Sequence, residues 1–434
     1  MKYFGTMKNE DGILSIGGVK VTELAQKYKT PLYIMDQELI EENMRNYKEN
    51  FKSEKFDTQI VYASKAFLAK AMCQLVEKYD MDIDAVSGGE LYTIKASGLP
   101  MSRVHMHGNN KTMEELEMCL DYEIGSIIID NEVEIDNLSK VCVEKNKKMK
   151  VMLRVNIGID AHTHEYIRTS KHTSKFGESI FDKKLVGIVK KIVEDKNLEF
   201  LGFHCHIGSQ IFDTKAFLEA IESMVVETKK ISDILNIEIP EINLGGGFGV
   251  YYTENDVAID VKEFMKIMIE HLEKSIEKHN LNTKKVSIEP GRSIVGNAGS
   301  TLYTIGGYKN TYGGVKYMFI DGGMTDNIRP ALYQAEYDGV IANKLNETEK
   351  ELITVAGKCC ESGDLIIKNK ELPKGEKGDL LLVTTTGAYG YSMASNYNKL
   401  QRPAVVFVKN GKSSLAIRRE SYEDLVRNDL AIEL

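Results

Sequence analysis

The sequence predicts an α/β protein with a (β/α)8 TIM-type barrel followed by a C-terminal β domain. From about residue 58, short apolar segments alternate with segments of helical periodicity, and eight such strands can be placed. After about Gly296 the helical pattern fades, and β-rich segments such as "ELITVAGK" and "DLLLVTTTGAYG" follow. Polar and glycine-rich motifs gather at the strand ends, where barrels of this type keep their active sites.

The barrel strands are the short apolar segments between residues 60 and 290. They are expected at 60–63, 82–86, 103–107, 126–130, 151–155, 201–206, 241–244 and 286–290. Amphipathic helices fit between most of them, for example "TMEELEMCLDYE", "FDKKLVGIVKKIVEDK" and "DVKEFMKIMIEHLEKSIEKHN". The stretch "QIVYASKAFLAKAM" predicts a strand that passes directly into a helix, with Lys65 at the junction.

The change of pattern predicts three parts of the chain. An N-terminal segment, 1–35, has no place in the eight-strand count and is expected to pack with the β domain. The barrel is expected at 36–296 and the β domain at 297–434. A polar insertion at 158–179 follows the fifth strand and is expected to be either a lid over the barrel mouth or a loop.

Composition excludes several classes of function. The chain has 434 residues and a net charge of −8, without a basic cluster, which argues against nucleic-acid binding. No apolar run reaches the length of a membrane span, and the start "MKYFGTMKNEDG" lacks the pattern of a secretory signal. Six scattered cysteines show no zinc-ligand spacing, so no metal is expected and reduced thiols in a cytoplasmic protein are the default interpretation.

Lys65 is the first candidate for chemistry, because it stands where a buried strand ends. Its stem could simply lie over apolar surface with the ammonium in water. A lysine at a pocket mouth can instead form a Schiff base with a carbonyl compound. The choice depends on the other strand ends, which offer Asp84, "HMHGNNK", Arg154, "FHCHIGSQ", "LGGGFG" and "IEPGR".

Three consecutive glycines, Gly245, Gly246 and Gly247, follow the seventh strand in "LGGGFGV". Glycine lets the backbone approach an anion closely and point its N–H groups at it. Phosphate sites of such barrels use the loops after strands seven and eight, so the position favours phosphate over a mere turn. Ser209, in "HIGSQ", could add a hydroxyl.

Glu289 ends the eighth strand, and His206 ends the sixth. A carboxylate there could keep the ring nitrogen of a pyridine cofactor protonated, and a histidine could stack on the ring. His204 lies one pleat deeper and is more simply structural. Together with Lys65 and the glycine turn, these residues describe a site for pyridoxal 5'-phosphate.

The motifs also resemble a known family, the diaminopimelate decarboxylases of the alanine racemase-like class of pyridoxal phosphate enzymes. The similarity runs through the barrel in "YASKA", "VSGGEL", "HGNNKT", "SKFG", "HCHIGSQ", "LGGGFGV" and "EPGRSIV". It continues through the β domain in "MTDNIRPALY", "CESGD" and "TTGAYGYSMASNYN". The resemblance covers nearly the whole chain and implies decarboxylation of meso-2,6-diaminopimelate to L-lysine and CO₂.

The resemblance implies a role for each matching residue. Lys65 would be the Schiff-base lysine, with Asp84 and Glu90 near it; His206, Ser209, Gly245, Gly246, Gly247, Glu289, Gly291, Arg292 and Tyr389 would bind cofactor. Arg292, Arg329, Tyr333, Glu361 and Tyr389 would bind substrate, and Cys360 would be the candidate proton donor. In the family Cys360 and Glu361 reach the site from a partner subunit, which implies a homodimer with shared active sites.

Alternatives of other kinds stay open at this point. A decarboxylase of ornithine, arginine, D-lysine or carboxynorspermidine would share the cofactor half, but Arg329 and Glu361 suit a substrate with a second amino acid centre. An alanine racemase would pair the ring nitrogen with arginine rather than Glu289. A non-catalytic regulatory relative would not need both Lys65 and Cys360.

Overall fold

The computed structural model describes residues 2–159, 174–257 and 259–433. Most of the predicted insertion, including the lid expected within 158–179, therefore lies outside the described residues. The chain divides into two compact units: Met1–Asn43, Tyr251–Val257 and Ile294–Leu434 form one, and Met44–Val250 with Ala258–Ser293 form the other. The predicted boundaries at residues 36 and 296 stay a prediction.

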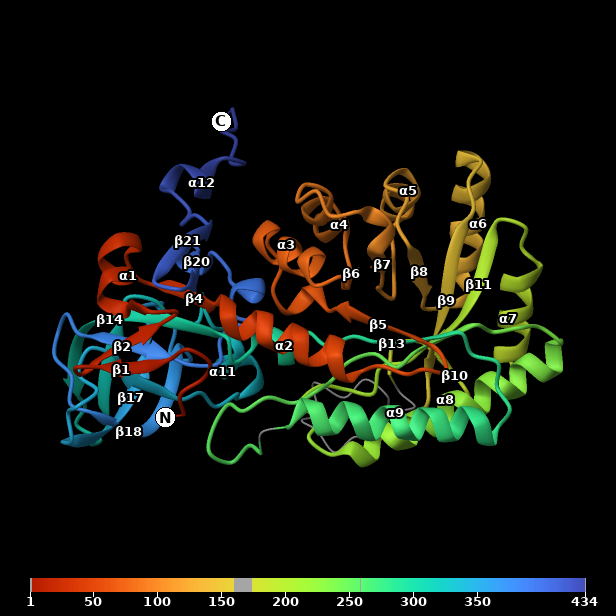
Figure 1. The fold of residues 1–434 in the computed structure, drawn as a ribbon. Helices are drawn as coiled ribbons and strands as arrows, with labels where there is room; N and C mark the ends of the chain where they lie inside the picture. The colour runs from red at the N-terminus through yellow and green to blue at the C-terminus, as the bar shows by residue number, and fades with distance from the viewer. Residues whose placement is uncertain (1, 160–173, 258, 434) are drawn as a thin grey trace. The chain divides into compact units, whose positions relative to one another are not determined.

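The second unit is a closed parallel barrel, as predicted (Figure 1). Its strands are β5 (Asp57–Tyr62), β6 (Asp82–Ala85), β7 (Val104–Met106), β8 (Ser126–Ile129), β9 (Met149–Asn156), β11 (Leu198–His204), β12 (Glu241–Asn243) and β13 (Lys285–Ile288). Each pairs in parallel with the next, β8 pairs with β9, and β13 pairs with β5, which closes the ring. A short strand, β10 (Glu178–Ser179), adds to β9.

Helices alternate with these strands. They are α2 (Gln37–Asn50), α3 (Lys70–Lys78), α4 (Gly88–Lys95), α5 (Met113–Asp121), α6 (Glu132–Lys145), α7 (Leu185–Glu194), α8 (Thr214–Leu235) and α9 (Val261–Lys278). Local signals start them: Thr112 and Glu115 form a reciprocal capping box before α5, and Asn131 caps α6. In α9, Phe264, Met268 and Leu272 recur at helical spacing and are buried.

The predicted direct passage from strand to helix at Lys65 is wrong in detail. A 3-10 turn, η1 (Ser64–Ala66), follows β5, and α3 begins only at Lys70. Phe67 is extended, with φ of −163°, and its carbonyl accepts a hydrogen bond of 2.8 Å from the Tyr62 hydroxyl. Burial of Phe67 in the barrel therefore overrides the helical spacing of its neighbours.

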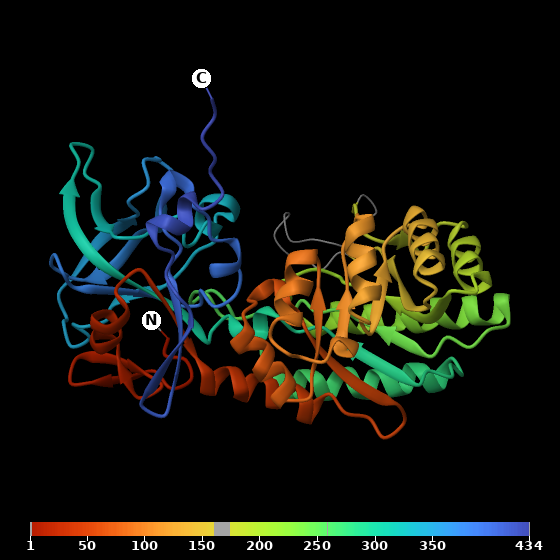
Figure 2. The same ribbon diagram turned by 90° about the horizontal axis from the view of Figure 1, so that it is seen from above.

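The first unit is built on a sheet in the order β18-β17-β15-β14-β4-β20-β21, with β19 paired to β14 and β16. Figure 2 shows this unit with its strands in teal and blue and the N-terminal segment in red. The strands are β4 (Leu32–Asp36), β14 (Gly299–Asn310), β15 (Lys316–Ile320), β16 (Gly339–Ile341), β17 (Lys350–Ala356), β18 (Leu365–Pro373), β19 (Leu380–Val383), β20 (Ala404–Lys409) and β21 (Lys412–Ile417). The N-terminal strand β4 lies between β14 and β20, so the start of the chain belongs to this sheet.

Smaller elements complete the first unit. A three-stranded sheet comprises β1 (Lys8–Glu10), β2 (Ile13–Ile16) and β3 (Val19–Lys20), followed by α1 (Val21–Tyr28), and α11 (Arg329–Tyr333) and α12 (Tyr422–Val426) lie later in the chain. The short helix α10 (Arg292–Val295) begins in the second unit and ends in the first. Leu14, Ile16 and Leu24 pack into one core with Leu302 and Val406. Among the described residues, no helix is long and apolar enough to cross a membrane.

Candidate active site

Lys65 and Asp84 lie at the ends of neighbouring barrel strands. The Asp84 side chain is buried, and its Oδ1 accepts a hydrogen bond of 2.6 Å from the Ser64 amide. Burial raises the pKa of Asp84 to about 6, although the charges of His107 and Lys65 act in the opposite direction. The Asp84 carboxylate thus holds the turn that carries Lys65, and it also interacts electrostatically with the Lys65 ammonium.

Glu90, the other acid expected near Lys65, lies in the first turn of α4. Its Oε2 accepts a hydrogen bond of 2.7 Å from the Val86 amide. Burial raises the pKa of Glu90, while the Val86 amide, Ser64 and Lys65 act to lower it. Asp84 and Glu90 therefore both interact electrostatically with Lys65.

Glu289, the residue after β13, is buried at the centre of a polar cluster. Its Oε2 accepts a hydrogen bond of 3.0 Å from His204 Nε2, and its Oε1 accepts one of 2.8 Å from Asn243 Nδ2. His107 Nε2 lies 3.1 Å from Oε1. Burial acts to raise the pKa of Glu289, but His107 and His204 outweigh it and hold that pKa well below its usual value. Glu289 is therefore a carboxylate at neutral pH.

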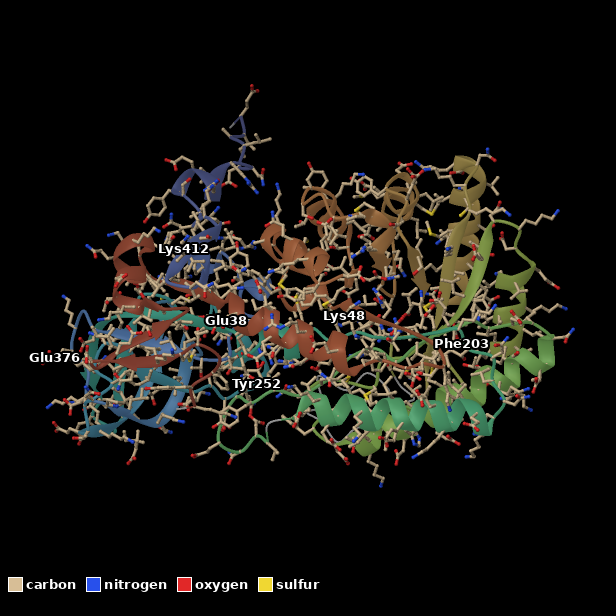
Figure 3. The ribbon with its side chains drawn as sticks, viewed as in Figure 1. Glu38, Lys48, Phe203, Tyr252, Glu376 and Lys412 are labelled. Carbon is tan, nitrogen blue, oxygen red and sulfur yellow. The ribbon has the colours of Figure 1, made fainter. Side chains whose placement is uncertain are left out.

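His206 follows β11, two residues after His204; Phe203, which precedes His204, is labelled in Figure 3. The Gly246 amide donates a hydrogen bond of 3.2 Å to His206 Nδ1, so this nitrogen carries no proton. Burial, and then the charges of Lys65 and Arg154, hold the pKa of His206 well below its usual value. His206 is thus a neutral ring with its orientation fixed by the glycine turn.

The three glycines after β12 pass very close to other strand ends. A Cβ on Gly245 would lie 2.3 Å from the Cys205 carbonyl oxygen, one on Gly246 2.0 Å from that of Glu289, and one on Gly247 2.4 Å from that of Gly208. Gly245 and Gly247 also have positive φ values of 67° and 120°. Only glycine fits here, and the turn brings backbone amides to the mouth of the barrel.

Ser209 and Arg292 form a pair beside this turn. Arg292 Nη2 donates a hydrogen bond of 3.0 Å to Ser209 Oγ, and Arg292 is itself buried. The Ser209 hydroxyl proton is left to donate to a ligand. Gly291, next to Arg292, lies against Ala63, the residue after β5, whose Cβ a Cβ on Gly291 would approach to 2.7 Å.

The barrel residues fit a pyridine cofactor that carries a phosphate. Three buried polar atoms of the cluster, Ser64 Oγ, His107 Nε2 and His204 Nδ1, have no hydrogen-bond partner among the described residues. Hydroxyl, guanidinium and amide donors suit a phosphate, a buried carboxylate suits a protonated ring nitrogen, and a lysine suits an aldehyde.

The remaining predicted residues belong to the first unit, where Arg329 starts α11. Arg329 is buried, and its Nε donates a hydrogen bond of 3.0 Å to the Tyr337 hydroxyl. Its guanidinium lies 5.1 Å from the centre of the Tyr333 ring and 5.5 Å from that of Tyr389. No carboxylate pairs with Arg329 in the described part of the chain, so tyrosines surround a buried cation that can receive an anion.

Tyr389 is held in a left-handed conformation, with φ of 59°. Such a conformation costs a residue with a Cβ about 1–2 kcal/mol, and it persists where the surroundings impose it. Next to it, a Cβ on Gly390 would lie 2.5 Å from the Thr386 carbonyl oxygen. The turn thus fixes the direction in which Tyr389 meets Arg329.

Cys360 and Glu361 are both exposed in the isolated chain. The Cys360 amide donates a hydrogen bond of 2.7 Å to Asn398 Oδ1, while the Cys359 amide donates one of 2.8 Å to Asp364 Oδ2. Burial raises the pKa of the Cys359 thiol to about 11, which makes it a poor nucleophile or acid. The two adjacent cysteines therefore differ, and Cys360 is the accessible one.

Several residues of this site were not singled out from the sequence. Asn243 and His107 contact Glu289 from other strands, and Tyr337 contacts Arg329. Asp364 Oδ1 also accepts a hydrogen bond of 2.6 Å from the Met324 amide, which ties the loop before Arg329 to the loop of Cys360. His107 and Asp364 stand in motifs quoted above, but their spacing does not reveal their partners.

Comparisons with known proteins agree with this geometry. Residues 37–296 match the model of the pyridoxal-dependent decarboxylase, pyridoxal binding domain. The chain is 47% identical to diaminopimelate decarboxylase of Bacillus subtilis (strain 168), over 98% of this chain and 96% of that protein. It is similar to diaminopimelate decarboxylase from M. jannaschii in complex with L-lysine, with a TM-score of 0.92 and 34% identity over 98% of both chains.

A second solved structure is also similar. It is diaminopimelate decarboxylase from Helicobacter pylori complexed with L-lysine, with a TM-score of 0.85 and 30% identity over 94% of this chain and 98% of that one. The similarity spans both units and nearly the full length of each relative. This chain therefore belongs to the diaminopimelate decarboxylase family, a family of pyridoxal-dependent enzymes.

Proposed function

We propose that this enzyme decarboxylates meso-2,6-diaminopimelate to L-lysine and CO₂, the last step of lysine biosynthesis, with pyridoxal 5'-phosphate as cofactor. The observation that carries the proposal is the buried, ionised Glu289 at the end of β13. An anion at that place suits a protonated pyridine ring, and the cofactor when bound supplies a cationic ring that withdraws electrons from the substrate Cα.

Each barrel residue then has a task toward the cofactor. Lys65 supplies the amine that attaches it, and Asp84 holds the turn that carries Lys65. The neutral His206 ring offers a stacking face. Phosphate is held by Ser209, Arg292, Gly291 and the turn of Gly245, Gly246 and Gly247, whose lack of side chains lets the backbone approach it.

Recognition of the substrate is assigned to Arg329, Tyr333 and Tyr389. Diaminopimelate has an amino acid centre at each end, and only one end reacts. Arg329 is a buried guanidinium with tyrosine neighbours, which suits the distal carboxylate that L-lysine lacks. Arg292, which is hydrogen-bonded to Ser209, is assigned to the phosphate and to a substrate carboxylate.

Cys360 and Glu361 are proposed to act in the active site of a partner subunit within a homodimer. Their exposure supports this, because residues that bind substrate or deliver a proton to Cα need a site that excludes water. In this arrangement Glu361 receives the distal ammonium and Cys360 is the candidate proton donor. Each active site would then be complete only in the dimer.

The cell compartment is also a proposal. All six cysteines are free thiols in the structure, including the adjacent pair Cys359 and Cys360. Free thiols persist in a reducing compartment, which supports the cytoplasm.

A decarboxylase of a different basic amino acid is the second candidate. The lysine/ornithine decarboxylase from Vibrio vulnificus shares the fold, with a TM-score of 0.76 at 21% identity. Its substrates have no distal carboxylate, so they would leave Arg329 buried without a counter-ion. We therefore favour diaminopimelate.

A direct assay tests the substrate assignment. The purified enzyme, supplied with pyridoxal 5'-phosphate, is given meso-diaminopimelate, L-lysine, L-ornithine or L-arginine, and CO₂ and amine products are measured. We expect CO₂ and L-lysine from diaminopimelate, with kcat/KM at least a hundredfold above the others. A higher kcat/KM with a substrate that lacks the distal carboxylate would overturn the assignment.

A further inference from the structure

Glu289 is held by side-chain donors from two barrel strands, and a third polar side chain lies close to it. His204 of β11 donates to Oε2 at 3.0 Å, and Asn243 of β12 donates to Oε1 at 2.8 Å. His107, which follows β7, places Nε2 3.1 Å from Oε1, outside hydrogen-bond geometry. One donor on each oxygen prevents the carboxylate from rotating about its own axis.

The backbone of Glu289 is fixed as well. Its amide donates a hydrogen bond of 2.8 Å to the Gly245 carbonyl. Its own carbonyl oxygen lies so close to Gly246 that a Cβ there would be 2.0 Å away. Asn243 takes part at both ends of this arrangement, because its Oδ1 accepts a hydrogen bond of 2.9 Å from the Gly245 amide. Hydrogen bonds therefore restrain both the main chain and the side chain of Glu289.

The charges of the cluster agree with this pattern of donors. Burial lowers the pKa of His204 and that of His107, which favours the neutral form of both rings. An ionised Glu289 only accepts hydrogen bonds, so His204 carries its proton on Nε2. Its Nδ1 is buried and has no partner among the described residues. The His107 ring packs edge-on against His204, with centroids 4.9 Å apart.

The two oxygens of the Glu289 carboxylate differ in how many acceptor sites they have left for a ligand. A carboxylate oxygen has about two lone pairs. Among the described residues, Oε1 faces both Asn243 and His107, whereas Oε2 faces only His204. We infer that His204 and Asn243 are positioning residues, which present Oε2 of Glu289 to the ring nitrogen of the bound cofactor. This inference rests on the proposed function, in which Glu289 pairs with that nitrogen.

A divalent cation is the competing occupant of this cluster. His107, His204 and Glu289 each offer a ligand atom, and these atoms lie within 4.8 Å of one another. The two histidines, however, contact different oxygens of Glu289, which is the pattern of separate donors to one carboxylate. The positive charge of Lys65, which acts on His204, also opposes a cation. The geometry favours hydrogen bonding.

The test removes each donor while keeping the shape of the site. Asn243→Asp loses the N–H that faces Oε1 but retains the acceptor for Gly245, and His204→Phe retains a ring without a donor. His204→Gln is the conservative variant, because its amide N–H reaches a similar distance. His105→Gln is the matched control: this barrel histidine bonds Ser126 at 2.7 Å and Asp82 at 3.0 Å instead.

Two readouts are followed in each holoenzyme variant: kcat and KM for diaminopimelate, and the ¹⁵N chemical shift of ring-labelled pyridoxal phosphate. Asn243→Asp and His204→Phe should lower kcat by about 10- to 100-fold, as loss of outer-shell partners does at metal sites. KM should change less than about threefold, and the ring-nitrogen signal should move toward that of neutral pyridine. His204→Gln should recover most of kcat, and His105→Gln should match the wild type.

Glu289→Gln separates this inference from the proposed function. If Glu289→Gln leaves kcat and the ring signal unchanged, the assignment of Glu289 itself fails. If Glu289→Gln is impaired but Asn243→Asp and His204→Phe behave like wild type, only the positioning role is overturned.

The double variant Asn243→Asp/Glu289→Gln should be no slower than Glu289→Gln alone, because both changes remove the same interaction. If the reductions in kcat of the two single variants instead multiply in the double variant, Asn243 acts independently of Glu289. Should His204→Phe not fold, Asn243→Asp with its double variant decides the question.

Zn²⁺ alone, titrated into the apoenzyme and followed by calorimetry, tests the competing occupant. We expect the wild-type apoenzyme to bind no stoichiometric Zn²⁺ at this cluster, so that wild type and His204→Phe give the same titration. Such binding, with pyridoxal phosphate displaced in proportion, would show that the cluster is a metal site.

Discussion

The side-chain oxygen of Asn398 accepts a hydrogen bond of 2.7 Å from the backbone amide of Cys360. Asn398 has a φ of 52°, a left-handed conformation that asparagine tolerates better than most residues. Cys360 is exposed, and this bond restrains the main chain from which its thiol projects. The contact joins the motif "TTGAYGYSMASNYN" to the motif "CESGD".

We expect Asn398→Ala to lower kcat about tenfold while the enzyme stays folded. The variant loses a neutral hydrogen bond, of about 0.5–1.5 kcal/mol, and adds roughly 1–2 kcal/mol of strain at positive φ. Asn398→Asp keeps the acceptor oxygen and should retain most of the rate. The measurement is steady-state kinetics, with urea unfolding as the control for stability. Equal rates for Asn398→Ala and wild type would show that Cys360 is positioned by other contacts.

The raised pKa of Asp84 predicts a pH-dependent stability of the apoenzyme. The pKa is about 6 in the folded chain against about 3.9 when unfolded, so the folded state binds the proton more tightly. Stability from this group is therefore present below about pH 4 and is lost as pH rises through 6. Asp84→Asn lacks this group and should not lose that stability. Between pH 4 and pH 8, the free energy of unfolding of the variant should therefore change in its favour, relative to that of wild type, by on the order of 1–3 kcal/mol. Urea unfolding of both proteins at pH 4 and pH 8 measures this difference. If the free energy of unfolding changes equally with pH in both proteins, the prediction is wrong.

Lys65→Ala tests the attachment of the cofactor. Purified wild type should be yellow, and the variant should lose the absorbance of the lysine-linked cofactor together with nearly all turnover, because no other amine is proposed to link to it. The absorbance spectrum after reconstitution is the readout. A variant that keeps both the spectrum and normal activity would place the attachment at another lysine.

Mixing subunits tests whether active sites are shared. Lys65→Ala and Cys360→Ala dimers are each expected to be nearly inactive, and a randomly mixed population contains half mixed dimers. Each mixed dimer has one intact site of two, so activity should recover to about a quarter of wild type. Mass spectrometry confirms subunit exchange. If exchange is complete and no activity returns, each chain builds its own site.

The sequence predicts the barrel because its strands are short, apolar and evenly interrupted by amphipathic helices. It does not predict the 3-10 turn at Lys65, because burial of Phe67 overrides local helical spacing. The hydrogen-bond partners of Glu289 are even harder to predict from the sequence. Asn243 lies 46 residues from Glu289, and only the parallel pairing of β12 with β13 brings their side chains together.

The same limit applies to the residues of the β domain that are proposed to bind substrate. Arg329, Tyr333 and Tyr389 stand in motifs that resemble those of the family, but Tyr337, whose hydroxyl accepts a hydrogen bond from Arg329, does not. Tyr252, labelled in Figure 3, packs edge-on against Tyr337 at 5.3 Å between ring centroids, although 85 residues separate them. Tertiary packing, rather than local pattern, therefore decides how Arg329 is presented.

The distal carboxylate of diaminopimelate is the feature that Arg329 is proposed to recognise. A buried cation built to pair with a carboxylate rejects a substrate that lacks it, because the charge is then left unpaired. Arg329→Ala should therefore cost about 2–5 kcal/mol in transition-state binding of diaminopimelate. Arg329→Lys keeps the charge but loses the planar fork, and its cost should be intermediate.

The measurement that tests the central claim most directly is the ratio of kcat/KM for diaminopimelate to kcat/KM for L-lysine, in wild type and in Arg329→Ala. We predict that this ratio falls by at least about thirtyfold in the variant, since 2 kcal/mol corresponds to roughly that factor. An unchanged ratio would contradict the account, because Arg329 would then not read the distal carboxylate and the assignment of diaminopimelate would lose its main physical support.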